Sequence, residues 1–131
     1  MNKDDIQVIL QGFVGIISAV LLALPSTVLA LLVLQAIDVI TGLMAGYITK
    51  SLDSKVSYVG LMRKALVLVA VAGSSYLGAA LQLPSPELLP TAIAGFYSLH
   101  EGLSILENLV RSGVPLPEQL KNAMRKPTDD A

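Results

Sequence analysis

Length, composition and charge already narrow the possibilities for this chain. Among its 131 residues, 53% are hydrophobic and 15% are charged, the mean hydropathy is +0.68 and the formal net charge is −1. Soluble domains carry about 25% charged residues, so an ordinary water-soluble domain is disfavoured. The length allows a single domain, and the lack of cysteine excludes disulfides, thiolate metal sites and cysteine nucleophiles.

Four apolar runs follow one another, each about as long as the roughly 20 residues that a transmembrane helix needs. They are residues 6–24, 27–48, 65–83 and 88–110. Proline ends helices. Pro25 separates the first run from the second, and the prolines within Pro84–Pro90 separate the third run from the fourth. The runs lack the alternation of barrel strands, and hydrocarbon admits only helices or closed barrels. We therefore expect an all-α integral membrane protein, with a transmembrane domain at residues 1–110 and a cytoplasmic tail at residues 111–131.

The first run is expected to remain in the protein as a span. A signal peptide has a basic start and an apolar core of about 7–15 residues that then turns polar. Here Met1–Asp5 is net acidic, and apolar sequence continues past the faint cleavage pattern at Val28–Ala30.

The positions of the basic residues predict the topology. All nine Lys and Arg residues lie at the N-terminus, in a polar connector at residues 49–64, or after residue 110. Basic residues accumulate on the cytoplasmic side, so four spans with both termini cytoplasmic fit the pattern. The alternative has three spans, with one run lying flat on the membrane or entering it as a re-entrant hairpin. It places one of the three groups of Lys and Arg residues outside the cytoplasm.

Two runs carry ionisable residues near their centres: Asp38 in the second, and His100 with Glu101 in the fourth. A charge at mid-bilayer costs about 2.5–3.5 kcal/mol on insertion scales, so such residues are paired, water-lined or functional. Residues three or four apart share a helix face. The predicted membrane-embedded polar site comprises Gln35, Asp38, Thr41, His100, Glu101 and Ser104.

Several interpretations of this polar site remain open. Asp38 and His100/Glu101 fall at similar depth in the four-span arrangement. His100 could pair with a carboxylate and so hold helices together within or between subunits. Alternatively, the carboxylates could be protonated in apolar surroundings. They could also line an aqueous lumen between subunits. Glu107 and Arg111, four residues apart, are expected to form an ordinary ion pair.

Small residues predict close helix contacts, and no catalytic motif is present. The predicted packing residues are Gly42, Gly46, Ser74 and Gly78, the first two forming a GxxxG motif. The chain has one histidine, no phosphate-binding loop and no HExxH spacing. We expect no enzymatic activity, no cofactor or metal, and no nucleic-acid binding.

Two motifs, in this order, resemble the phage-lysis and toxin-secretion holin family. The first is Asp38-Val-Ile-Thr41-Gly42, followed by a connector that contains Gly60 and Arg63-Lys64. The second is Glu101-Gly-Leu-Ser104-Ile-Leu-Glu107-Asn108, followed by Gly113-Val-Pro115-Leu-Pro117. Together they cover the segment from Gln35 to Leu120.

The resemblance implies a small multi-pass protein of the bacterial cytoplasmic membrane that forms homo-oligomers among lipids and opens lesions or pores. Through these an endolysin or an exported toxin leaves the cytoplasm, and an antiholin is a further partner that the resemblance allows. Two other classes compete with this interpretation. One is a small ion channel or proton-coupled transporter subunit that uses Asp38 and Glu101 as a relay. The other is a non-conducting membrane anchor of a larger assembly.

Overall fold

The computed structural model describes residues 2–124, apart from the side chains of residues 20, 21 and 23. Within this part the chain forms helices and no strands, which confirms the all-α prediction. The helices are α1 (Lys3–Ala23), α2 (Ser26–Ile48), α3 (Ser54–Ala80), α4 (Leu88–Arg111) and α5 (Glu118–Met124). Residues 125–131 of the expected cytoplasmic tail lie outside the described residues. By length and composition, α2 and α3 could each cross a membrane.

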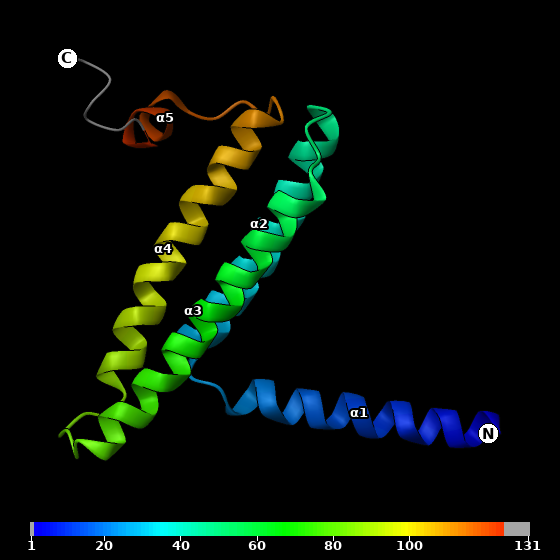
Figure 1. Cartoon of the computed structure of the whole chain (residues 1–131), viewed down its shortest axis with the longest axis vertical. Coiled ribbons are helices and arrows are strands. Elements are labelled where there is room, and N and C mark those ends of the chain that lie inside the picture. The colour runs from blue at the N-terminus through cyan, green and yellow to red at the C-terminus, as the bar shows by residue number, and fades with distance from the viewer. Residues whose placement is uncertain (1, 125–131) are drawn as a thin grey trace.

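Helices α2, α3 and α4 form a bundle from which α1 projects away (Figure 1). Helix α4 packs mainly against α2 and less against α3, whereas α2 and α3 touch each other least. Helices α2 and α4 run in one direction and α3 runs in the opposite one (Figure 1). Along α1, every side chain from Asn2 to Ala19 is exposed. The bundle is therefore the part of the fold that brings the polar residues together.

Helix α3 begins at Ser54, well before the apolar run at residues 65–83. Asp53 explains this early start, because its Oδ1 accepts hydrogen bonds from the backbone N–H groups of Lys55 (2.8 Å) and Val56 (3.4 Å). Such a cap satisfies donors that have no partner inside the helix. The prediction of a polar connector at residues 49–64 is therefore wrong in extent. The loop is residues 49–53, and Lys64 belongs to α3.

All three bundle helices end in the same hydrogen-bond pattern. The residues with positive φ at these ends are Lys50 (54°), Gln82 (49°) and Gly113 (83°). The next backbone N–H then donates to a carbonyl five residues earlier: Ser51 to Gly46 at 2.9 Å, Leu83 to Gly78 at 3.2 Å and Val114 to Leu109 at 3.0 Å. This is the Schellman motif, which turns the chain sharply while satisfying helix-end carbonyls. The turns after α2 and α3 are consequently tight enough to place successive helices side by side.

The bundle interior has an apolar part and a polar part. Leu31, Val71 and Ala94 are buried together, one from each bundle helix. About one and two turns beyond Leu31 along α2, the buried residues are the polar Gln35 and Asp38. The outer surface, in contrast, exposes large hydrophobic side chains on all three helices. A polar interior within an apolar exterior is the reverse of the distribution in soluble proteins.

Small residues allow close approach within the chain. Three of the predicted packing residues each approach a residue outside their own helix: Gly42 approaches Asn108, Gly46 approaches Leu52, and Gly78 approaches Pro86. The tightest contact is at Gly78, where a Cβ atom would lie 2.6 Å from the backbone oxygen of Pro86. Ser74, the fourth, is buried, and its hydroxyl donates to the Val71 carbonyl at 2.7 Å. In this structure these small residues therefore serve contacts within one subunit.

We predict that Gly78→Ala destabilises the bundle by about 1–3 kcal/mol, because the new methyl group collides with backbone that cannot rotate away. Gly73→Ala is the matched control on the same helix, where a Cβ would meet nothing within 4 Å. The control should be neutral or stabilising, since alanine favours helix by about 1 kcal/mol over glycine. Thermal unfolding in detergent measures both, and equal effects would contradict the close approach at Gly78.

Candidate functional site

The candidate site is a cluster of polar side chains inside the bundle, with one acidic residue on each of two parallel helices. Asp38 of α2 is 9% exposed and Glu101 of α4 is 4% exposed. Asp38 shares a helix face with Gln35 and Thr41, because residues three apart lie above one another. This face of α2 is directed at α4, its main packing partner.

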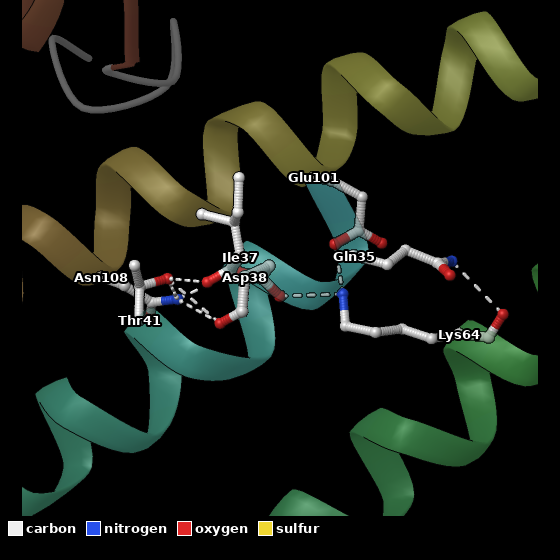
Figure 2. Close-up of polar contacts among 7 residues, drawn as sticks. All are labelled: Gln35, Ile37, Asp38, Thr41, Lys64, Glu101 and Asn108. Atoms are coloured by element: carbon white, nitrogen blue, oxygen red, sulfur yellow. Dashed lines mark hydrogen bonds and ion pairs between the residues drawn. The ribbon is translucent and has the colours of Figure 1, made fainter. Parts of the chain in front are cut away.

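Lys64 of α3 lies between the two carboxylates (Figure 2). Its Nζ atom is 2.8 Å from Asp38 Oδ2, and it also forms an ion pair with Glu101 Oε2. The side chains of Lys64, Asp38 and Glu101 are 15%, 12% and 5% exposed. One ammonium group thus links all three bundle helices. When all three groups are ionised, the cluster carries one more negative charge than positive.

Amide side chains extend the cluster on both sides (Figure 2). On one side, Asn108 Nδ2 donates to Asp38 Oδ1 at 2.9 Å and to Thr41 Oγ1 at 3.3 Å. On the other, Gln35 Nε2 donates to the backbone carbonyl of Lys64 at 3.3 Å. Within the described part of the chain, no fully buried side-chain nitrogen or oxygen lacks a hydrogen-bond partner. The network is complete, which is the condition under which a buried polar cluster is stable.

Two hollows border the ion pair. A groove of about 520 Å³ lies between α3 and α4, and a smaller hollow of about 280 Å³ extends toward the loop after α2. Asp38, Lys64 and Ser104 line both of them. The charged cluster is therefore buried among side chains but can be approached from outside the bundle.

The structure brings most of the sequence-predicted polar residues together. Gln35, Asp38, Thr41 and Glu101 belong to the network around Lys64 and Asn108. Ser104 borders it through the two hollows. His100 does not join it, since its side chain is exposed at the edge of the groove. The cation beside the carboxylates is a lysine and not the histidine.

Arg111 also differs from the sequence-based expectation. Its Nη2 atom donates to the Gly42 carbonyl at 3.1 Å and connects the end of α4 to α2. No ion pair between Glu107 and Arg111 is formed among the described residues. Glu107 is instead exposed on the outside of α4.

Lys64 is the principal residue that sequence reasoning missed. The apolar run begins directly after Lys64, at Ala65, so hydropathy places Lys64 in the predicted polar connector. Two signals could have corrected this: Asp53 is a favoured N-cap residue, and Lys64 shares a face with Gly60, Val71 and Gly78. The two buried carboxylates also favour a nearby cation, and Lys64 directly precedes the apolar run at residues 65–83. Within residues 2–124, no group of His, Cys, Asp and Glu could hold a metal ion.

We predict that Lys64→Met destabilises the bundle by about 3–5 kcal/mol, because removing one partner leaves buried charge without compensation. Lys55→Met, at an exposed position of the same helix, should have little effect. Unfolding in detergent, followed by circular dichroism, compares the two variants. Similar stabilities would show that the ion pair does not hold the three helices together.

Comparison with known proteins assigns the chain to a family. The sequence profile of the bacteriophage holin family matches residues 15–128. An uncharacterized 14.9 kDa protein of Clostridium perfringens is 38% identical over 75% of this chain and 74% of its own length. The uncharacterized protein YqxH of Bacillus subtilis is 36% identical over 72% of this chain and 66% of its own length.

A phage protein is among the relatives. The probable holin of Bacillus phage phi105 is 37% identical over 66% of this chain and 63% of its own length. No solved structure gives a significant match. The matched segment contains the whole polar cluster, from Gln35 to Asn108. The chain is thus a membrane protein that belongs to the bacteriophage holin family.

Proposed function

We propose that this protein is a holin: several copies assemble in the bacterial cytoplasmic membrane and open lesions that release a folded enzyme. The observation that carries this proposal is the inverted polarity of the bundle. Charged and amide side chains lie inside, while the outside exposes aliphatic and aromatic side chains. A bundle of this kind is stable among lipid tails while it is closed. Its interior polar side chains form a surface that would be exposed if the helices separated.

This buried polar surface supports a transition from closed subunits to a water-filled lesion. The polar surface can face lipid only at high cost, so a single subunit keeps it closed around Lys64. When many copies gather, the same surfaces can turn toward each other or toward water. Four helices are too few to enclose a protein-sized passage, so a large opening requires several copies.

The proposed topology has four spans with both termini in the cytoplasm. Lys50 and Lys55 lie near the loop between α2 and α3, at the same end of the bundle as Arg111 (Figure 1). The opposite end carries the proline-rich turn before α4. The basic end therefore faces the cytoplasm by the positive-inside rule. If α1 also crosses the membrane, Lys3 lies on the cytoplasmic side, which is consistent with this arrangement.

The proposed cargo is an endolysin or another folded protein that lacks its own export signal, and an antiholin is a proposed regulatory partner. The name of the phage phi105 relative, a probable holin, supports this class of function. A small-solute channel or transporter subunit is the second candidate, because the hollows beside the ion pair offer a route to Asp38. A transporter of that kind would not pass a folded enzyme.

Induced expression separates these candidates and tests the polar cluster. We predict that the wild-type protein collapses the membrane potential and releases a folded cytoplasmic enzyme, both followed in the same culture. Asp38→Leu should abolish or retime the release without reducing membrane insertion. Asp38→Asn should be milder, since its amide oxygen still accepts a hydrogen bond from either Lys64 or Asn108.

Loss of potential without release of the enzyme would favour the channel. If Asp38→Leu releases the enzyme at the same time and to the same extent as the wild type, the polar cluster has no part in lesion formation. Immunoblotting of the membrane fraction controls for the amount of each variant.

Single-cysteine labelling tests the topology, because the natural chain contains no cysteine. We predict that an impermeant thiol reagent added to intact cells labels Ser85→Cys, in the turn before α4, and leaves Ser54→Cys unlabelled. Permeabilised cells should show labelling of both. Labelling of Ser54→Cys in intact cells would reverse the proposed orientation.

A further inference from the structure

Two opposite charges on the outside of the bundle have no partner within it. Arg63 of α3 and Glu107 of α4 are both exposed, and neither forms an ion pair with another described residue. Each lies near large exposed hydrophobic side chains on its own helix. The exposed hydrophobic residues on these two helices include Val56, Val59 and Leu66 on α3, and Phe96, Leu103 and Val110 on α4.

An unpaired charge on a lipid-facing surface is costly unless it reaches the interface or finds a partner. Arg63 lies within α3, one of the helices long and apolar enough to cross a membrane. Its immediate neighbour Lys64 is already engaged by the two buried carboxylates. Arg63 is therefore available to an acidic partner from elsewhere, and Glu107 is available to a basic one.

We infer that the surface formed by α3 and α4 is the contact between two copies of this chain, with Arg63 of each copy paired with Glu107 of the other. This inference rests on the proposed placement of the bundle in a membrane. The two copies have the same orientation in the membrane and are related by a two-fold axis along the bundle. Such an axis sets α3 of one copy opposite α4 of the other, twice.

Both charges lie on the side where the groove opens between α3 and α4. Arg63 and His100 line this groove. Glu107 is seven residues beyond His100, about two helical turns, so it continues the same face. A second copy seated here brings both charge pairs together and covers the groove.

The depths of Arg63 and Glu107 along the bundle also allow the two side chains to meet. Arg63 precedes Lys64 by one residue and Glu107 follows Glu101 by six, and both offsets point toward the basic end of the bundle (Figure 1). We take Lys64 and Glu101 as level because they pair; at about 1.5 Å of rise per residue, the Cα atoms of Arg63 and Glu107 then differ by about 7–8 Å along the axis. Because Cα–Cβ bonds tilt toward the helix N-terminus and α3 and α4 run in opposite directions, the two side chains lean toward each other. The long arginine stem can span the remaining distance.

The contact would also cover the polar cluster. The groove leads to Asp38, Lys64 and Glu101, so a second copy over it separates the buried ion pair from lipid on that side. Dimerisation and the state of the buried cluster are then coupled.

Charge reversal tests the pairing. Two forms of the chain with different affinity tags are expressed together, extracted in mild detergent, and the amount of one that co-purifies with the other is measured. Arg63→Glu alone, and Glu107→Arg alone, should each reduce co-purification at least about tenfold, because like charges then face each other in both pairs. Lys55→Glu, an exposed change on the same helix, should behave as the wild type.

The decisive sample contains Arg63→Glu in one tagged form and Glu107→Arg in the other. Each copy then supplies the charge that its partner lacks, so co-purification should return to the wild-type level. The recovery also shows that both variants fold. The double variant Arg63→Glu/Glu107→Arg should associate with itself.

Three results would overturn the inference. They are wild-type copies that do not co-purify, single variants that associate like the wild type, and recovery in the double variant but not in the mixture. The last result would indicate a pair within one chain. Release of a folded enzyme by the wild type is measured separately. If release occurs while the charge variants associate normally, the contact is refuted and the proposed holin function is retained.

Discussion

The burial of Lys64 between Asp38 and Glu101 is the interaction on which the bundle depends. These three residues come from three different helices, and each would be costly in hydrocarbon without the others. Helices α2 and α3 touch each other little, so Lys64 supplies a connection that packing alone does not. Asn108 and Gln35 satisfy the neighbouring polar atoms and hold the carboxylate of Asp38 and the backbone at Lys64 in place. A closed arrangement of the three helices follows from these pairings.

The same arrangement determines which surfaces remain for contact with other copies. Gly42, Gly46 and Gly78 are occupied by neighbours in the same chain, so the motifs that usually join membrane helices are already used inside the subunit. The outer faces of α3 and α4, and the exposed α1, remain available. On these faces, Arg63 and Glu107 add opposite charges to a mainly apolar surface. Pairing of these charges fixes how two copies are placed against each other, which apolar packing alone would not do.

Much of the fold could be predicted from local sequence. Apolar runs of sufficient length and the prolines between them indicated helices, and α1, α2 and α4 lie close to the predicted runs. Of the candidate site, Asp38 and Glu101 were recognisable because an acidic residue inside an apolar run is conspicuous. The start of α3 was not, since hydropathy follows the composition of a segment, whereas the helix begins where Asp53 caps it. A helix start placed too late leaves Lys64 in the connector, and His100 is then the cation considered for pairing with a carboxylate.

The sequence by itself determined the class of protein, the helical content and the presence of buried acidic residues. These properties depend on side-chain hydrophobicity and on the positions of prolines, which are local. The identity of the cation was decided only in three dimensions, since Lys64 is separated from Asp38 by 26 residues and from Glu101 by 37. The rotation of α3 about its axis directs Lys64 inward, and the same rotation leaves Arg63 outside. The face that Lys64 shares with Gly60, Val71 and Gly78 favours its burial over that of Arg63, but only the packing of α3 against α2 and α4 decides which of the two is buried.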